Sequence, residues 1–473
     1  MGKRPAITEL LEGNMNFIQR KRWPPMQRGE LPVMATGLER IAAKARCEPK
    51  LRFTSLAHHV TRERVWDNLC RVPAKTATGV DGQTVEEAKE QFEAWIEPML
   101  RSMHQQGYRA PAVRRVHIPK PGKREKRPIG VPCVTDRALQ RSVAEVLSAV
   151  YEEDFLPFSC GGRPGKGAHH ALATVTEVIA GRKVGWVLEA DLKNFFGSLD
   201  HGWLLRFVEQ RVGDPRLLNL IRRWLKAGAL EDGVHQQSDE GTPQGGSISV
   251  LLSNVYLHYV LDLWFERVVK PRLQGEAYMV RYLDDFVVCF QYRADALRFQ
   301  AVLQKRLTKF SLTLESTKTK LVEFGRFAAK HAPKRGRNRP ETIYFVGFTL
   351  YCSRNQGGGF KVGLRTEKSR LNRTLADLRD LMRRMRHLPV REQVLNLNSR
   401  LRGHFAYFGV AGNFRALQRI VRAVERYWRK MLSSRSRKGK VTWDAFHQIK
   451  KRYPLQRPRL HLPHRKLQAL AVL

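Results

Sequence analysis

Residues 278–290 constrain the fold of this chain most strongly, because they combine two apolar runs with a pair of acids. The segment reads YMVRYLDDFVVCF, and Asp284 and Asp285 lie between the two runs. Short apolar runs bounded by turn residues predict strands, so this segment predicts a β-hairpin with carboxylates at its tip. A second apolar run, residues 185–190, ends at Asp191 and predicts another strand with an acid at its end.

Carboxylates at the ends of buried strands are costly in free energy unless a cation neutralises them. If adjacent strands bring Asp191 together with Asp284 and Asp285, their oxygens form the kind of site that Mg²⁺ prefers. Two Mg²⁺ ions at such a site can activate a primer 3′-hydroxyl and stabilise a leaving pyrophosphate. The alternative is that these are ordinary turn aspartates. The apolar strands on both sides of the acids favour the metal site.

The net charge of the chain predicts the class of its partner. The sequence contains 85 lysine and arginine residues and 44 aspartate and glutamate residues, which gives a formal net charge of +41. A chain this basic repels itself and attracts polyanions, and binding to phosphates releases counterions. An anionic membrane surface or a merely soluble basic protein are the alternatives. Because the positive charge runs along the whole chain, we favour nucleic acid.

Membrane proteins, secreted proteins and zinc proteins are disfavoured by features that the sequence lacks. No stretch reaches the ~18 uncharged apolar residues of a membrane helix, and the first residues lack the apolar segment of a secretory signal. No zinc-bearing nuclease module is visible, because the cysteines show no C-x-x-C spacing. They are Cys47, Cys70, Cys133, Cys160, Cys289 and Cys352. We expect a cytoplasmic protein with free thiols and no membrane association.

The pattern of apolar residues divides the chain into three parts. Residues 1–57 are basic and predict an extension with one or two short helices. Residues 58–355 mix strand-like and helix-like segments. Residues 356–473 predict an all-helical region with a basic tail, because apolar residues recur there at helical spacing. The two apolar stripes are Leu364, Leu371, Leu375, Leu378, Met382 and Met385, and then Phe414, Leu417, Ile420, Val421, Val424, Trp428 and Met431. The expected fold class is α+β followed by an all-α region.

A series of short segments connects this chain to a known family. In chain order they are GVDGQT (79–84), YRAPAVRRVHIPKPGKREKRPIGVPCVTDRALQ (108–140), FSCGGRPGKGAHHAL (158–172), ADLKNFFGSLDH (190–201), GTPQGGSISVLLSNVYLHYVLD (241–262), RYLDDFVV (281–288), YFVGF (344–348) and RLRGHFAYFGV (400–410). Together they resemble the motifs of the reverse transcriptase–maturase proteins of bacterial group II introns. The similarity runs from about residue 58 to the C-terminus. Each segment is short, but the ordered series is specific.

The resemblance implies a right-hand polymerase, with fingers and palm in residues 58–355 and a helical thumb or maturase domain in residues 356–473. It implies an RNA-directed DNA polymerase that extends a primer on an RNA or DNA template with deoxynucleoside triphosphates. Two Mg²⁺ ions, or Mn²⁺ in their place, would serve as cofactors, and the family also binds intron RNA. The implied metal-binding residues are Asp191, Leu192, Asp284 and Asp285, of which the three aspartates are catalytic.

A nucleotide pocket is also implied by the resemblance. Phe196 would be a steric gate whose ring leaves no room for a 2′-hydroxyl, and the alternative is a core phenylalanine. Gln244 and Gly245 would line the pocket, where glycine lets the backbone approach closely. A simple turn is the alternative there.

Three basic residues complete the implied pocket. Lys120 and Arg127 flank a predicted fingertip hairpin and would hold the triphosphate, since lysine offers a point charge and arginine a fork. Arg163 would brace the nucleotide or template, or else serve as a structural loop arginine. The neighbours in the same basic run, which are solvated in the plainest interpretation, are Lys123, Arg124 and Lys126.

Four positions depart from the family pattern. Leu283 stands where the family usually has alanine, directly before the acid pair. Because Leu283 lies beside the predicted metals, it could alter the fit of the primer or the nucleotide. The other three departures are Gly162 for phenylalanine, Gly197 for aspartate and Val250 for proline.

Three functions remain open on this evidence. The first is an intron-encoded enzyme that binds its own intron RNA, assists splicing and copies that RNA into DNA. The second is a domesticated, free-standing polymerase that acts in DNA repair or defence, which Leu283 and the missing nuclease module favour. The third is a non-catalytic RNA-binding maturase, which the intact acids disfavour. The sequence leaves the oligomeric state open, including a homodimer.

Overall fold

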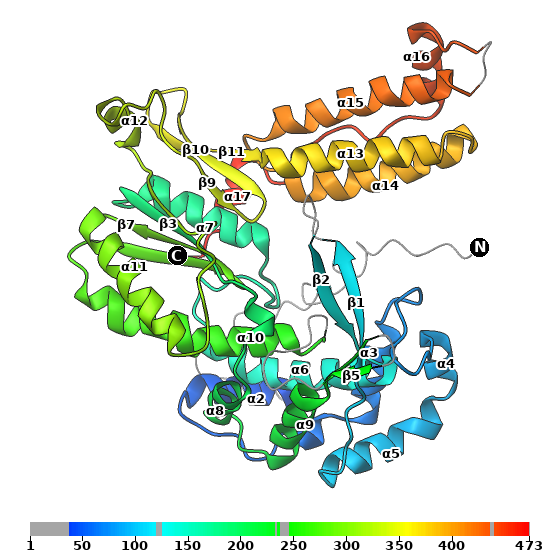
Figure 1. Ribbon diagram of the computed structural model, residues 1–473, viewed down its shortest axis with the longest axis vertical. Coiled ribbons are helices and arrows are strands. Elements are labelled where there is room, and N and C mark those ends of the chain that lie inside the picture. The colour runs from blue at the N-terminus through cyan, green and yellow to red at the C-terminus, as the bar shows by residue number, and fades with distance from the viewer. Residues whose placement is uncertain (1–36, 120–124, 232–233, 237–245, 436–438, 473) are drawn as a thin grey trace.

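The computed structural model describes residues 37–119, 125–231, 234–236, 246–435 and 439–472 (Figure 1). A four-stranded antiparallel sheet with the order β6–β7–β3–β8 carries the predicted acidic segments. Its strands are β3 (Trp186–Asp191), β6 (Ala277–Tyr282), β7 (Asp285–Phe290) and β8 (Lys320–Glu323). The predicted hairpin is confirmed, because β6 and β7 pair directly and only two residues join them.

Alternation of side chains explains how both faces of this sheet are covered. Val187 and Val287 belong to one core cluster together with helix α7 (Ala168–Gly181), whereas Leu188 belongs to a second cluster with helix α11 (Arg293–Thr308). Successive residues of a strand point to opposite faces, so one strand contributes side chains to both clusters. Because helices cover both faces, most residues of the two central strands are apolar.

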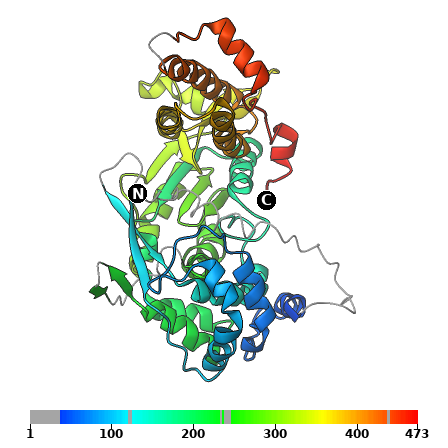
Figure 2. The ribbon, with the colours of Figure 1, turned by 90° about the vertical axis from the view of Figure 1, so that its right-hand side faces the viewer.

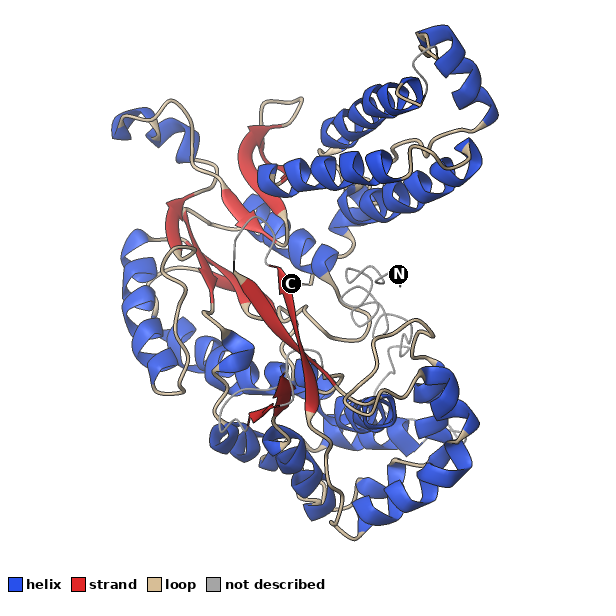
Figure 3. Cartoon of the chain, turned by 45° about the vertical axis from the view of Figure 1, so that its right-hand side comes forward, coloured by secondary structure: helices blue, strands red, loops and turns tan. Residues whose placement is uncertain are grey.

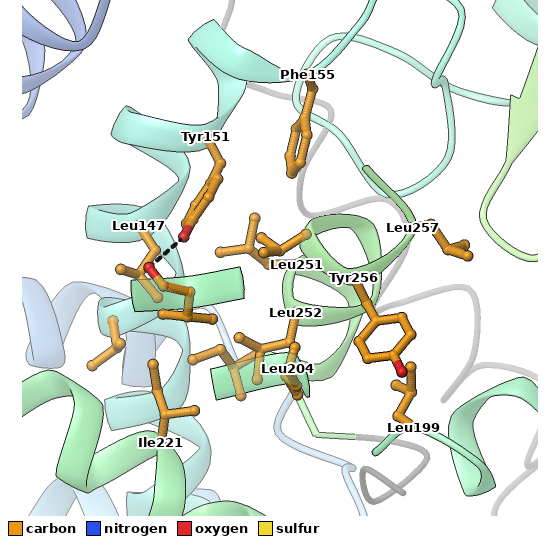
Figure 4. Close-up of a cluster of buried hydrophobic side chains, with 14 of the residues drawn as sticks. Leu147, Tyr151, Phe155, Leu199, Leu204, Ile221, Leu251, Leu252, Tyr256 and Leu257 are labelled. Atoms are coloured by element: carbon orange, nitrogen blue, oxygen red, sulfur yellow. Dashed lines mark hydrogen bonds between the residues drawn. The ribbon is translucent and has the colours of Figure 1, made fainter. Parts of the chain in front are cut away.

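Helix α6 (Val134–Asp154) is the centre of the helical layer that Figure 1 draws below the sheet. In Figure 4, Tyr151 of this helix donates a hydrogen bond of 3.0 Å to the carbonyl of Val208. Helices α2 and α3 pack against α6. The other helices of this layer are α2 (Gly37–Cys47), α3 (Arg62–Cys70), α4 (Val85–Glu90), α5 (Phe92–His104), α8 (His201–Glu209) and α9 (Pro215–Lys226).

Residues 249–269 form a long, largely buried helix whose pitch changes along its length. Helix α10 (Ser249–Leu257) continues into two π-helical turns, His258–Asp262 and Phe265–Val269. In Figure 4, Leu251, Leu252 and Tyr256 of α10 lie in the same core as α6. Segments of π-helix inside α-helices are often found near functional sites.

The charged hairpin predicted near residue 120 is an antiparallel pair of strands, β1 and β2. These strands belong to a second sheet with the order β2–β1–β4–β5. Figure 2 shows the hairpin rising from the helical layer along one side of the molecule. Its tip, residues 120–124, lies outside the described residues. The strands of this sheet are β1 (Val113–Pro119), β2 (Lys126–Val131), β4 (Ala229–Glu231) and β5 (Val234–Gln236).

A third sheet corrects the helix expected to include Leu364. Leu364 lies in a strand and pairs with Leu350, because residues 348–366 form an antiparallel hairpin. Its seven-residue distance from Leu371 matches a helical repeat by coincidence, since the strand continues to Thr366 and the next helix begins only at Lys368. The strands of this sheet are β9 (Ile343–Phe345), β10 (Phe348–Arg354) and β11 (Phe360–Thr366), and the short helix α12 (Ala328–His331) precedes them.

The all-helical region therefore begins at Lys368. All but the last of its helices lie together at one end of the molecule in Figure 3, and the last packs against α7. The second predicted apolar stripe is confirmed except at its first residue: Leu417, Val424 and Trp428 are buried on one side of α15, whereas Phe414 is exposed. The helices are α13 (Lys368–Arg384), α14 (Val390–Phe408), α15 (Phe414–Ser433), α16 (Trp443–Arg452) and α17 (His464–Gln468). The α+β class with a helical C-terminal region, as the sequence predicted, is confirmed.

Candidate active site

Three carboxylates converge at one end of the central sheet. Asp191 is the last residue of β3 and is paired in register with Asp285, the first residue of β7. Asp284 belongs to the two-residue turn that joins β6 to β7. Because β3 and β7 are neighbours, the strands carry all three side chains to the same end of the sheet. This is the juxtaposition that the sequence predicted.

Burial and mutual repulsion oppose the charged forms of these acids. Desolvation and then the charge of Asp191 raise the pKa of Asp284 to about 6. Desolvation and the charges of Asp191 and Asp284 raise the pKa of Asp285 to about 7. Carboxylates held together in this way are short of compensating positive charge, so bound cations would stabilise their ionised forms.

One lysine that the sequence interpretation missed supplies part of that charge. Lys318 lies between α11 and β8, and its ammonium forms an ion pair with the carboxylate of Asp191. Burial opposes the charged ammonium, but the hydrogen bond to Asp191 and the charges of the acid cluster outweigh burial and raise the pKa of Lys318. The surrounding sequence, STKTK, resembles an ordinary solvated turn, so no local pattern singled out Lys318.

The acid cluster offers carboxylate oxygens of the kind that bind Mg²⁺. Across the described ranges, no three His, Cys, Asp or Glu side chains form a ready ligand set. Mg²⁺ is commonly bound by one or two carboxylates and completes its shell with water and substrate phosphates. Asp191 and Asp284 meet that requirement. The side chain of Leu192 is buried in the core, so only its main-chain carbonyl could act as a ligand.

The turn that carries Asp284 is strained. Leu283 has a φ of +57°, in the left-handed region that glycine usually occupies in such two-residue hairpins. The Leu283 side chain packs on Gly161 and Gly162, where an added Cβ would collide with Leu283 at the first position and with Val250 at the second. Three of the four departures from the family pattern therefore lie together, because Val250 and Leu283 both lie beside Gly162.

A buried ion pair stabilises this turn from the protein interior. Arg281 and Asp262 are both fully buried, and the Nε of Arg281 donates to a carboxylate oxygen of Asp262 at 2.8 Å. The same guanidinium donates to the carbonyl of Leu283 at 3.1 Å and to the side chain of Asn254 at 3.0 Å. A buried charge pair is stable only when its hydrogen bonds are satisfied, which is the case here.

Comparisons with known proteins decide the family. A family model described as reverse transcriptase (RNA-dependent DNA polymerase) matches residues 118–350, which include all three aspartates. Protein YkfC of Escherichia coli strain K12 is 31% identical over 340 residues, covering 63% of this chain and 88% of YkfC. Group II intron-encoded protein LtrA of Lactococcus lactis subsp. cremoris is 32% identical over 255 residues.

The chain belongs to the group II intron-type reverse transcriptase family. The match to LtrA covers 52% of this chain but only 42% of LtrA, so the shared part is less than half of that relative. Nuclear intron maturase 3 of Arabidopsis thaliana is 27% identical over 172 residues, which are 32% of this chain and 24% of that protein.

From here on, the central sheet is called the palm sheet and the β1–β2 hairpin the fingers hairpin, after the parts that the resemblance predicts. Arg127 is exposed on β2, and its charge lowers the pKa of Asp284, opposing the larger effect of burial. The fingers hairpin therefore lies close enough to the palm acids for electrostatic interaction. Lys120, Lys123 and Arg124 lie outside the described residues.

The remaining predicted pocket residues differ in how many contacts within the protein hold their side chains. Phe196 is half-buried in a short 3₁₀ turn after β3, where its ring packs on Phe195 with 5.4 Å between centroids. The buried guanidinium of Arg163 donates to Glu152 at 2.9 Å and to the carbonyl of Leu156 at 2.8 Å. These bonds favour the structural interpretation of Arg163. Gln244 and Gly245 lie outside the described residues.

Within the part of the chain that the structure describes, no helix combines the length and the apolar composition needed to span a bilayer.

Proposed function

We propose that this protein is an RNA-directed DNA polymerase of the group II intron type, which extends a primer on an RNA or DNA template. The observation that carries the proposal is the convergence of Asp191, Asp284 and Asp285 at one end of the palm sheet, inside the matched reverse transcriptase domain. Such a cluster suits nucleotidyl transfer, in which most of the catalysis comes from positioning and from stabilising phosphate charge.

The carboxylates of Asp191 and Asp284, with the main-chain carbonyl of Leu192, would hold divalent cations. When bound, two such ions lower the pKa of the primer 3′-hydroxyl and neutralise the charge of the leaving pyrophosphate. Lys318 adds a fixed positive charge beside Asp191. Arg127, together with Lys120, would hold the triphosphate from the fingers side.

Discrimination between deoxynucleotides and ribonucleotides is assigned in this proposal to Phe196. Its ring follows Asp191 by five residues and is only half-buried, so one face can meet the sugar of an incoming nucleotide. Gln244 and Gly245 would line the same pocket. Arg163 is left with the role of holding its loop.

The helical thumb would contribute contacts to RNA. Helices α13 and α15 bury an apolar stripe and expose basic residues elsewhere, a pattern that suits binding to phosphates. Assistance to the splicing of a group II intron RNA is part of this proposal, because LtrA is named as an intron-encoded protein. The exposed basic residues are Lys368, Arg370, Arg379, Arg383, Arg384, Arg415, Arg419, Arg422, Arg426 and Lys430.

A second candidate role is a free-standing polymerase in DNA repair or defence. One specific observation favours it: Leu283 packs with Gly162 and close to Val250, so the departures beside the acids form one altered contact set. A non-catalytic maturase is disfavoured, because the structure keeps the three acids together.

Primer extension on an RNA template with Mg²⁺ and deoxynucleotides tests the proposed activity. The wild-type protein, Asp191→Ala and the matched control Asp377→Ala, an exposed aspartate on α13, should be compared. DNA product from the wild type and the control, but none from Asp191→Ala, is the expected result. No product from any of the three in Mg²⁺ or Mn²⁺ would overturn the proposal and favour the non-catalytic maturase.

A further inference from the structure

The turn between β9 and β10 has an unusual backbone. Val346 and Gly347 are its two residues, and both have positive φ, +42° and +82°. Two-residue hairpins of this kind favour asparagine and glycine. A β-branched residue at positive φ is a real outlier, and such strain persists only where the surroundings determine the conformation. The groups that contact Val346 therefore hold the turn in this conformation.

Contacts with three different elements hold this turn. The backbone amide of Val346 faces the carboxylate of Asp285 and lowers the pKa of that acid against the larger effect of burial. The carbonyl of Val346 accepts a bond of 2.8 Å from the hydroxyl of Tyr407, in helix α14. The carbonyl of Gly347 accepts a bond of 3.1 Å from the backbone N–H of Glu367, directly before α13.

A second bond ties the same hairpin to the other catalytic strand. Glu189 lies two residues before Asp191 on β3, so both side chains point to the same face of the sheet. The buried carboxylate of Glu189 accepts a hydrogen bond from the backbone N–H of Tyr344, in β9. Strand β9 packs against both β3 and β7. The hairpin therefore spans the two strands that carry Asp191 and Asp285.

Tyr407 is itself firmly placed. Its ring is stacked on Phe348, with 5.9 Å between centroids, and its backbone carbonyl lies 2.7 Å from the Nε2 of His169, on α7. Burial raises the pKa of Tyr407, so its hydroxyl stays protonated and donates to Val346. Figure 1 shows β9 and β10 between the palm sheet and helices α13 to α15. Tyr407 thus connects the helical thumb to a turn that touches the acid cluster.

We propose that Tyr407 is a positioning residue for nucleotidyl transfer. Its hydroxyl holds the strained Val346–Gly347 turn, and the amide of that turn orients the carboxylate of Asp285 beside Asp191 and Asp284. The inference rests on the proposed polymerase function. It makes the thumb helix α14 part of the support of the active site, through the Tyr407 hydroxyl and the Val346 amide. Simple packing of the thumb on the palm would not need the hydroxyl.

The test compares Tyr407→Phe with Tyr256→Phe. Tyr256 is a matched control, because its buried hydroxyl also donates 2.8 Å to a backbone carbonyl, that of Phe310, in the core below the sheet. Hydrogen exchange of the amides of residues 343–348 is measured first, without nucleic acid. Tyr407→Phe should speed the exchange of the Val346 amide by about tenfold, the size expected for one lost hydrogen bond, and Tyr256→Phe should leave it unchanged.

Single-nucleotide addition is then measured on the same proteins. Tyr407→Phe should lower kcat by about fivefold to tenfold with little change in the KM for the deoxynucleotide, because substrate contacts are intact. Wild-type exchange and wild-type kcat in Tyr407→Phe would overturn the inference, as would an equal loss in Tyr256→Phe. An inactive wild-type protein would instead defeat the proposed function, and the exchange result would still decide whether Tyr407 holds the turn.

Discussion

Lys318 and Asp191 form an ion pair at the end of the palm sheet where the three aspartates converge. The ammonium comes from the segment between α11 and β8, and the carboxylate from the end of β3. The charge of Lys318 also lowers the pKa of Asp284 and of Asp285, against the larger effect of burial. A single lysine therefore reduces the repulsion among the acids from a position that no sequence pattern revealed.

Removal of that lysine should shift the pH dependence of the reaction. In Lys318→Ala, Asp284 and Asp285 lose a neighbour that lowers their pKa, so the rising limb of the pH–rate profile of primer extension should move to higher pH. A shift of up to about one pH unit is expected, equivalent to about 1.4 kcal/mol. Lys318→Arg keeps the charge and should keep the wild-type profile. Lys320→Ala, which breaks a pair with Glu341, is the control. An unmoved profile in Lys318→Ala would count against this electrostatic role.

Asp285 should make the metal-free protein less stable as the pH rises. Its pKa in the folded state is about 7, above the ordinary value of 3.8. Between these values the folded state binds the proton more tightly than the unfolded state, so the free energy of unfolding falls as pH increases through this window. Asp285→Asn, whose amide oxygen can still accept from Val346, should therefore be the more stable protein at pH 8, by about 1–3 kcal/mol.

Thermal unfolding in a metal-free buffer from pH 5 to pH 8 measures this difference. Mg²⁺ at pH 8 should stabilise the wild type and reduce its disadvantage, because bound cations favour the ionised cluster. Parallel stability curves for the wild type and Asp285→Asn would contradict the assignment of the raised pKa.

Phe196 should control sugar selectivity. Phe196→Ala removes the ring that would exclude a 2′-hydroxyl, so incorporation of ribonucleotides should rise by about 10-fold or more relative to deoxynucleotides. The ratio of kcat/KM for the two sugars is the measurement. Phe196→Tyr keeps the ring and should keep the selectivity. If both variants discriminate as the wild type does, Phe196 is a core residue and the gate lies elsewhere.

Leu283 should influence how primers are used. Leu283→Ala removes the side chain that packs on Gly161 and Gly162, which loosens the turn that carries Asp284. The ratio of long extension products to products from short-overlap primers should change as a result. Leu395→Ala, at a leucine of α14 that is 60% exposed, is the matched control. The same product ratio in Leu283→Ala and the wild type would remove the main reason to expect a specialised role.

The sequence predicted the acid cluster well, because its signals are local. Each of Asp191, Asp284 and Asp285 ends or begins an apolar run, and such runs become neighbouring strands of one sheet. The family motifs then supplied the order of the elements. The boundary of the helical region was less predictable. Leu364 follows a helical spacing to Leu371, but pairing with Leu350 makes it a strand residue, and only tertiary contacts decide between the two.

The supporting contacts of the site could not be predicted, because they join residues far apart in the chain. Lys318 reaches Asp191 across 127 positions, and Tyr407 reaches Val346 across 61. Lys318 lies in a segment that resembles a solvated turn, and the motif that contains Tyr407 does not indicate which residue its hydroxyl contacts. Arg163 shows the converse, since its basic side chain suggested a nucleotide contact but bonds to Glu152 and Leu156 within the protein.

Metal-dependent extension by variants of Asp284 tests the central claim most directly. The wild type, Asp284→Ala and Asp284→Cys should be compared for addition of one deoxynucleotide in Mg²⁺ and in Mn²⁺, with binding to the primer–template measured in parallel. If Asp284 ligates the cation, Asp284→Ala should bind normally but extend in neither metal. Asp284→Cys should be inactive in Mg²⁺ and regain product in Mn²⁺, which accepts a thiolate ligand more readily. Extension by Asp284→Ala in Mg²⁺ at a rate near that of the wild type would contradict the account.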